Sequence, residues 1–333
     1  MSHTGNVTAT IADTQTDAHI LCVGEALIDI VQHHASTHTR EIPGGSPANV
    51  AMTIGRLGRP VRLSTWLGND ARGQVIAEHM RASHVQITPE SFGASRTSTA
   101  QALVDEHGSA TYQFDVEWAP SLPLRMSPDA VIVHTGSIAS VLEPGATTVF
   151  ETLKAAHTHA LITYDPNIRP SLMGTPWQAL PYVDRLVSLA DVVKVSDEDV
   201  DWLTDHAEME RIVDRWLSVG PSLVVVTRGP HGALVKTRSG VRIQVPAADV
   251  PVVDTMGAGD SFMGGIIDAL WRLGLTGAAA RPRLDAINEA ETRWIAEHSS
   301  AISGITIART GANPPWAEEL AAVEHNSPTS SIV

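Results

Sequence analysis

Four short apolar runs, rich in β-branched residues, constrain the fold of this chain more than any other feature. They are residues 130–134, 160–164, 191–195 and 223–227, and segments with helical spacing separate them. Continuous β-branched runs that alternate with helices are typical of a parallel sheet that is buried on both faces. We therefore predict an α/β fold in which ligands bind beyond the carboxyl ends of the strands.

The composition limits the partners of this chain. Its formal net charge of −14 argues against a nucleic acid partner, so any site for an anionic ligand must be positive only locally. None of its three lysines completes a Gly-x4-Gly-Lys-Ser/Thr loop, which excludes the usual P-loop route to phosphate. The single cysteine, Cys22, excludes a disulfide framework and fits a reducing cytoplasm.

The two ends of the chain lack periodic apolar patterns. Residues 1–18 are polar and have neither the basic start nor the apolar stretch of a signal peptide, so we expect a disordered N-terminal tail. We expect one folded domain over residues 19–320 and a flexible C-terminal tail over residues 321–333. No apolar run approaches the length of a membrane helix, so we expect no membrane partner.

One small-residue loop carries the clearest chemistry. Residues 254–265 read Asp-Thr-Met-Gly-Ala-Gly-Asp-Ser-Phe-Met-Gly-Gly and lead into a segment with helical spacing. Gly257, Ala258 and Gly259 leave backbone N–H groups open to an anion at the start of that helix. Asp260 adds a carboxylate beside the anion site, as expected where a hydroxyl loses its proton next to a phosphoryl group. A short Gly-Ala-Gly-Asp alone would more often be a capped turn.

The whole stretch resembles the C-terminal signature of the ribokinase-like (PfkB) carbohydrate kinases. The resemblance implies that Asp260 is the catalytic base and that the amides of residues 257–259 form an anion hole. It also implies ATP and Mg²⁺ as ligands, and a K⁺ loop beside Asp254. The implied fold is a ribokinase-like three-layer α/β/α sandwich, with a mainly parallel central sheet and a small β-sheet lid.

The N-terminal part of the chain offers candidates for sugar binding. Gly44, Gly45 and Asn49 form a Gly-Gly-x3-Asn pattern that resembles the N-terminal signature of the same family. Diglycine lets a ligand approach the backbone, and an asparagine offers a donor and an acceptor to a polyol. Asp29, a charge in an apolar run, is by itself a strand-edge turn residue or a ligand for sugar hydroxyls. The family places a substrate-binding aspartate at this point.

Two segments are expected to form the lid. Residues 96–118 contain two strand-like runs around a glycine-containing turn, which predicts a β-hairpin. Residues 30–43 would add to it and cover the site, as the family implies. The lid is also where we place a possible homodimer contact.

Polar residues follow the predicted strands of the second half. Asp-x-Asn-x-Arg, which ends at Arg169, resembles a sugar kinase segment that reaches toward phosphate or substrate, although such a loop can also be only capped. The usual Asn-x-x-Glu motif of the family is replaced here by Ser-Asp-Glu-Asp at residues 196–199. Asp199 or Glu198 would therefore have to hold the water molecules around Mg²⁺. The residues that we assign to the nucleotide are Asn167, Lys194, Thr227, Gly229 and Gly232.

These motifs together predict an ATP-dependent sugar kinase. The segment Lys-Val-Ser-Asp-Glu at residues 194–198 resembles the fructokinase branch of the family, so the expected acceptor is the primary 6-hydroxyl of fructose. A 2-keto-3-deoxygluconate kinase is the first alternative, in which Arg169 would face the substrate carboxylate, and a nucleoside kinase is a weaker one. A non-catalytic binding protein on this fold is disfavoured, because a pure binder has no use for Asp260.

Overall fold

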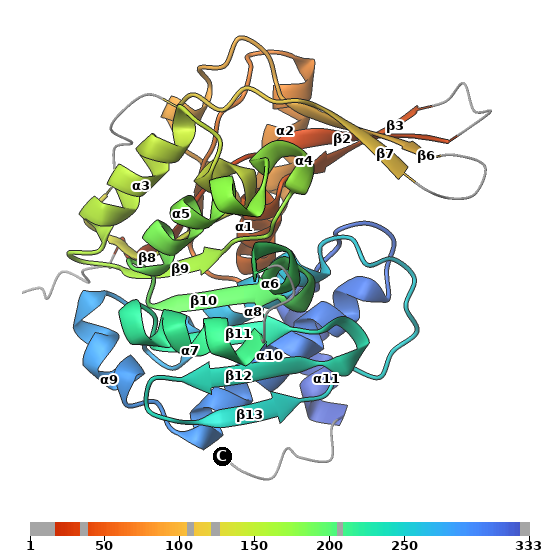
Figure 1. Ribbon diagram of the computed structural model, residues 1–333. Helices are drawn as coiled ribbons and strands as arrows, with labels where there is room; N and C mark the ends of the chain where they lie inside the picture. The colour runs from red at the N-terminus through yellow and green to blue at the C-terminus, as the bar shows by residue number, and fades with distance from the viewer. Residues whose placement is uncertain (1–16, 34–38, 105–109, 121–126, 205–208, 327–333) are drawn as a thin grey trace, which may run out of the picture.

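A nine-stranded sheet forms the body of the computed structural model, which describes residues 17–33, 39–104, 110–120, 127–204 and 209–326 (Figure 1). The strand order is β13-β12-β11-β10-β9-β8-β1-β4-β5, and all pairs are parallel except those that β12 makes. The strands are β1 (His19–Val23), β4 (Val61–Ser64), β5 (Val85–Ile87), β8 (Ala130–Gly136), β9 (Leu161–Asp165), β10 (Val192–Ser196), β11 (Leu223–Thr227), β12 (Ala233–Thr237) and β13 (Arg242–Val245). The prediction of a mainly parallel sheet is confirmed.

Both faces of the sheet are covered by helices, which gives the predicted three layers. One core contains residues of α1 (Ser46–Arg56), α2 (Ala71–Ala82), α8 (Ala258–Arg272) and α10 (Glu289–Ile307). The other core contains residues of α3 (Gly145–Ala156), α5 (Pro176–Val187), α6 (Asp197–Thr204) and α7 (Met209–Val219). Strand residues alternate between the two cores, so the runs are apolar throughout.

The shorter elements connect these layers. They are α4 (Pro170–Met173), α9 (Arg281–Asp285), and the 3-10 helices η1 (Pro89–Ser91), η2 (Ser137–Ser140), η3 (Gly229–His231) and η4 (Ala278–Ala280). The last helix, α11 (Ala317–Asn326), extends into the stretch that we expected to be a flexible tail from residue 321. It is anchored where buried Leu320 packs against Leu57 and Ile302. Residues 1–16 and 327–333 of the expected tails lie outside the described part of the chain.

A second, four-stranded sheet projects from the body beside the ends of the central strands (Figure 1). Its order is β3-β2-β6-β7, with a parallel β2–β6 pair between two antiparallel pairs. The strands are β2 (Leu27–His33), β3 (Thr39–Gly44), β6 (Thr99–Val104) and β7 (Ala110–Asp115). They fall in or beside the two segments that we expected to form a lid, and β6 and β7 form the expected hairpin.

No helix among the described residues has both the length and the apolar character needed to cross a membrane. Cys22 is buried in β1.

Candidate active site

The N-terminus of α8 delivers the small-residue loop to the carboxyl edge of the sheet. Gly257 has a left-handed backbone, with φ 73° and ψ 5°, immediately before the helix begins at Ala258. A Cβ at Gly257 would lie 2.6 Å from the Cβ of Ala312, so this position requires glycine on two grounds. Asp260 therefore sits in the first helical turn, and its side chain is largely buried.

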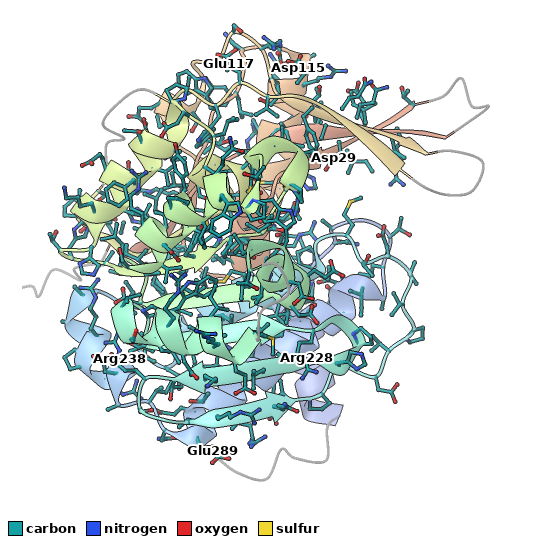
Figure 2. The ribbon with its side chains drawn as sticks, in the orientation of Figure 1. Asp29, Asp115, Glu117, Arg228, Arg238 and Glu289 are labelled. Atoms are coloured by element: carbon teal, nitrogen blue, oxygen red, sulfur yellow. The ribbon has the colours of Figure 1, made fainter. Side chains whose placement is uncertain are left out.

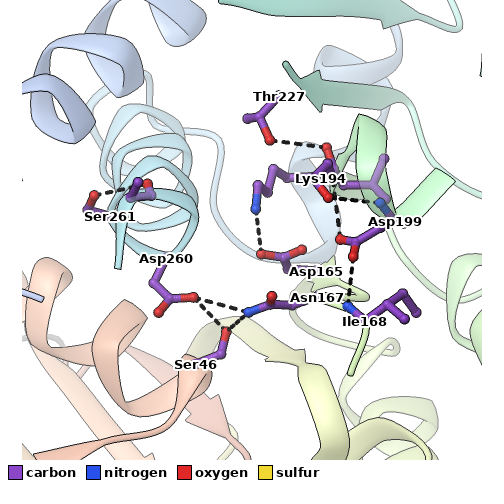
Figure 3. A network of polar contacts seen from close by, with 12 residues as sticks. Ser46, Asp165, Asn167, Ile168, Lys194, Asp199, Thr227, Asp260 and Ser261 are labelled. Atoms are coloured by element: carbon purple, nitrogen blue, oxygen red, sulfur yellow. Dashed lines mark hydrogen bonds and ion pairs between the residues drawn. The ribbon is translucent and has the colours of Figure 1, made fainter. Parts of the chain in front are cut away.

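Three side chains from distant segments hold the carboxylate of Asp260, and Figure 3 shows two of them, Ser46 and Asn167. Ser46 Oγ donates to Oδ1 at 2.7 Å, and Asn49 Nδ2 donates to Oδ2 at 2.8 Å, both from the first turn of α1. Asn167 Nδ2, from the loop after β9, donates to Ser46 Oγ at 2.7 Å and to Asp260 Oδ1 at 3.3 Å. These donors fix the orientation of the carboxylate before any substrate binds.

The loop before α8 has the features of an anion site. Within the described part of the chain, the N–H groups of Gly257 and Gly259 donate to no protein acceptor, whereas the N–H of Ala258 donates to Thr255 O at 3.2 Å. The free amides lie at the positive end of the helix dipole. Two of the three amides predicted to form an anion hole are thus open to a ligand.

A buried lysine lies beneath this loop. Lys194 Nζ would be 2.8 Å from a Cβ at Gly259, and it donates to Asp165 Oδ2 at 2.9 Å (Figure 3). Burial raises the pKa of Asp165 to about 6 against the pull of Lys194. Burial opposes the charge of Lys194 too, but Asp165 and other carboxylates outweigh it and raise the lysine pKa. The pair therefore places the Lys194 ammonium under the anion loop, while the Asp165 carboxylate offsets its positive charge.

A cavity of about 730 Å³ opens in front of Asp260. Asp29, Gly45, Asn49 and Arg169, all predicted to bind the substrate, line it together with Asp260. Figure 2 shows Asp29 where the lid joins the body. The structure thus brings together the side chains that the sequence assigned to the sugar.

Gly44 does not line this cavity, but it makes room for a residue that does. A Cβ at Gly44 would lie 2.0 Å from Asp29 Oδ2. Burial raises the pKa of Asp29 to about 6, and Arg169 acts in the opposite direction. The Arg169 guanidinium donates through Nη1 to Asn167 Oδ1 at 2.7 Å and to Ile168 O at 2.9 Å.

A second cavity, of about 820 Å³, lies on the other side of the loop. Thr227, Gly229 and Gly232, predicted to bind the nucleotide, line it. A Cβ at Gly232, where φ is +78°, would lie 1.9 Å from Val245 O, so the turn requires glycine. The two cavities share part of their walls, and the shared residues are Thr255, Ala258 and Gly259.

Two residues that we assigned to the nucleotide lie elsewhere. Asn167 lines the first cavity and bonds to the Asp260 carboxylate, because its backbone turns at φ 38° at the end of β9. Lys194 is buried under Gly259 and is not among the residues that line the second cavity. Neither side chain therefore lines the second cavity, and both lie close to the loop that the two cavities share.

The two predicted metal-binding aspartates are engaged by backbone N–H groups. Asp199 accepts from Ile168 N at 3.0 Å and from Ser196 N at 3.4 Å. Asp254 accepts from Met256 N at 3.0 Å and from Gly311 N at 2.8 Å, which ties the loop to the C-terminal segment. Among the described residues, no three His, Cys, Asp or Glu side chains are grouped as a metal site.

Sequence reasoning missed four side chains of this site: Glu25, Ser46, Ser137 and Asp165. Ser46 and Asp165 lie within motifs that we used, so the motifs could have identified them. Glu25 was visible as a charge just before an apolar strand. Ser137 has no comparable signal in the sequence.

An oriented carboxylate in one cavity, beside an anion loop shared with a second cavity, defines a phosphotransferase of the ribokinase-like fold. The family model described as pfkB family carbohydrate kinase matches residues 17–318, and the chain belongs to this family. It is similar to a fructokinase of Rhizobium leguminosarum bv. trifolii, with 33% identity over 75% of this chain and 79% of the relative. A fructokinase of Klebsiella pneumoniae is 31% identical over 75% of this chain and 84% of the relative.

Solved structures agree with this assignment. The structure of a fructokinase with bound ATP from Xylella fastidiosa superposes with a TM-score of 0.80 at 26% identity, covering 93% of this chain and 98% of that one. A fructokinase from Vibrio cholerae O395 in its fructose, ADP and calcium ion bound form gives 0.74 at 27% identity, covering 92% and 99%. The predicted family and fold are confirmed, and the chain is a carbohydrate kinase.

Proposed function

We propose that this chain transfers the γ-phosphoryl group of ATP to the primary 6-hydroxyl of fructose. The observation that carries the proposal is the common wall of the two cavities, Thr255, Ala258 and Gly259. A sugar in the first cavity and a triphosphate in the second would meet at this wall, beside Asp260. The relatives and neighbours that carry the name fructokinase support fructose as the acceptor.

In the proposed mechanism Asp260 accepts the proton of the attacking hydroxyl. Ser46 and Asn49 keep its carboxylate pointed into the sugar cavity, which removes the cost of orienting the base during the reaction. The amides of Gly257 and Gly259 stabilise the charge that develops on the phosphoryl oxygens. The proton leaves the hydroxyl oxygen as the new O–P bond forms and the bond to ADP breaks.

Metal ions enter the proposal through different residues. Mg²⁺, which when bound neutralises the β- and γ-phosphates, usually keeps several waters and takes only one or two carboxylates. Glu198 fits this role, since it lines the nucleotide cavity, whereas Asp199 is held by the backbone. Asp254, which joins two loops, is the candidate for K⁺.

The sugar is held by Asp29, Gly45 and Asn49 in this proposal. Arg169 lines the same cavity, and this observation keeps a 2-keto-3-deoxygluconate kinase as the second candidate, because a substrate carboxylate would find its cation there. Arg169→Ala separates the two functions. It should raise the KM of the keto acid selectively if the keto acid is the substrate, and leave the KM of fructose nearly unchanged if fructose is.

A coupled assay of ADP release tests the function directly. Wild-type protein is assayed with fructose, 2-keto-3-deoxygluconate, ribose and adenosine, and Asp260→Asn measures background ATP hydrolysis. We expect the highest kcat/KM with fructose. Faster turnover of the keto acid would replace fructose as the substrate, and no turnover of any acceptor above the variant's background would refute the kinase proposal.

The proposal also covers the compartment and the assembly of the protein. We place the protein in the cytoplasm, where ATP is available and a single buried thiol stays reduced. A homodimer through the lid is supported by β3 and β7, the two edge strands of the small sheet. Light scattering of the purified protein, with and without a proline in β7, measures this contact.

A further inference from the structure

A second carboxyl group lies in the sugar cavity and has no part in the proposed mechanism. Glu25 occupies the corner between β1 and β2 and lines the cavity that contains Asp29 and Asp260. Its side chain is only 4% exposed. Gly45 packs over its carbonyl, since a Cβ there would lie 2.5 Å from Glu25 O. The diglycine turn thus rests on the backbone of this glutamate.

The turn after β8 holds the Glu25 carboxyl in place. The N–H of Ala139 donates to Oε2 at 3.2 Å, and the hydroxyl of Ser137 lies close enough to lower the pKa of the carboxyl. Ser137 has φ 56°, in the left-handed region that serine rarely adopts. Its side chain is buried and lines the same cavity. Strained backbone at a ligand cavity is typical of a positioned functional group.

The Glu25 carboxyl is buried, and no salt bridge to it is found among the described residues. Burial raises the pKa of Glu25 to about 7, while its own backbone N–H, the neighbouring Ser137 hydroxyl and Ala139 N–H, and the charge of Arg169 act in the opposite direction. A turn that needed only an acceptor for Ala139 N–H would be served by glutamine at lower cost. Sugar hydroxyls, in contrast, are donors from which a carboxylate that lines this cavity can accept hydrogen bonds.

We propose that Glu25, held by the turn after β8, recognises a sugar hydroxyl that Asp29 does not contact, and so helps to select the sugar. Asp29 belongs to a strand of the lid, whereas Glu25 precedes that strand and is fixed to the turn at the end of β8. The two carboxyls therefore contact different parts of the sugar. This inference rests on the proposed function, since it requires a sugar in the cavity.

A cycle of variants and deoxy sugars tests the inference. KM and kcat are measured for wild type and Glu25→Ala with fructose and with each of its monodeoxy analogues that keeps the 6-hydroxyl. We expect Glu25→Ala to raise the KM of fructose about 10- to 100-fold, the range for one hydrogen bond to a charged group, and to leave the KM of ATP unchanged. For one analogue, which lacks the contacted hydroxyl, the two proteins should have equal KM.

Two further variants control for misfolding and for effects that are not specific to the sugar cavity. Glu25→Gln keeps an acceptor for Ala139 N–H and should show the same analogue dependence at smaller magnitude if Glu25→Ala does not fold. Glu117→Gln is the matched control, because Glu117 bonds to Ser95 and lies away from Asp29 (Figure 2). It should leave every sugar KM unchanged.

The outcomes separate the two proposals. An equal loss on fructose and on all analogues would assign Glu25 to the turn alone, and no loss on any sugar would remove it from the site. Either result overturns the inference. If wild type prefers another sugar, the proposed acceptor is wrong, and the cycle is run on deoxy analogues of the preferred sugar.

Discussion

Glu25→Gln should change how the stability of this protein depends on pH. The Glu25 pKa is raised from 4.5 to about 7 by burial in the folded state. Between these pH values the folded chain keeps a proton that the unfolded chain has lost. Unfolding then releases a proton, so the free energy of unfolding falls as pH rises from about 4.5 to 7. Above pH 7 the wild-type protein bears the whole free-energy cost of a buried, ionised Glu25 carboxylate, whereas the Glu25→Gln variant has no such charge.

The size of the effect follows from the same pKa values. Raising the pKa from 4.5 to about 7 corresponds to about 3 kcal/mol at pH 8. For 333 residues, an unfolding entropy of about 2.1 cal/mol/K per residue converts this energy into roughly 4 °C of Tm. The Gln side chain still accepts from Ala139 N–H, so little hydrogen bonding is lost. We expect the variant to be more stable than wild type at pH 8 by up to this amount.

Thermal unfolding of both proteins at pH 5 and pH 8 measures the effect. The gap between variant and wild type should widen from pH 5 to pH 8. Glu117→Gln should instead be less stable than wild type. A hydrogen bond from Ser95 lowers the pKa of Glu117, so the ionised carboxylate stabilises the folded state at pH values above its unfolded pKa. A gap for Glu25→Gln that is the same at both pH values, or a loss of stability at pH 8, would refute the reasoning.

Three other substitutions test the site. Asp260→Asn should lower kcat by about 10²–10⁴-fold with little change in ATP or sugar affinity, and near-normal turnover in a steady-state assay would remove Asp260 from the mechanism. Asp29→Ala should weaken sugar binding by about 1.5–3 kcal/mol for each charged hydrogen bond lost, measured by calorimetry, whereas an equal loss for ATP would indicate a folding defect. Lys194→Met should destabilise the fold by about 3–5 kcal/mol, because it leaves Asp165 buried and unpaired. Adding Asp165→Asn should recover most of that loss in denaturant unfolding, and no recovery would show that the pair is not the cause.

The sequence predicts the body of the fold well where burial alone decides the pattern. In β11, Leu223 and Val225 face one core and Val224 and Val226 face the other, so the run is apolar throughout. The antiparallel pairs of β12 were not predicted. The direction in which β12 pairs depends on the turn at Gly232 and on the position of the strand near the sheet edge. The periodicity of apolar residues indicates neither of these features.

The same limit applies to the site. Asp260 and its anion loop lie within a few residues, so one motif identifies them together. Glu25 and Ser137 are more than a hundred residues apart in the sequence, and they meet because β1 pairs with β8. Strand order brings the ends of β1 and β8 to the same edge of the sheet, and no local pattern of residues encodes that order.

The charge of the site limits where an incoming triphosphate can be held. The chain is strongly acidic, and the sugar cavity adds Glu25, Asp29 and Asp260 to the field that an incoming triphosphate meets. Lys194 is paired with Asp165, so it adds polarity under the loop with little net charge. The open amides at the start of α8 act only within the first helical turn. The open amides therefore attract an anion at the shared wall of the two cavities, and Arg169 attracts one within the first cavity. A triphosphate held at that wall would present its γ-phosphoryl group beside Asp260.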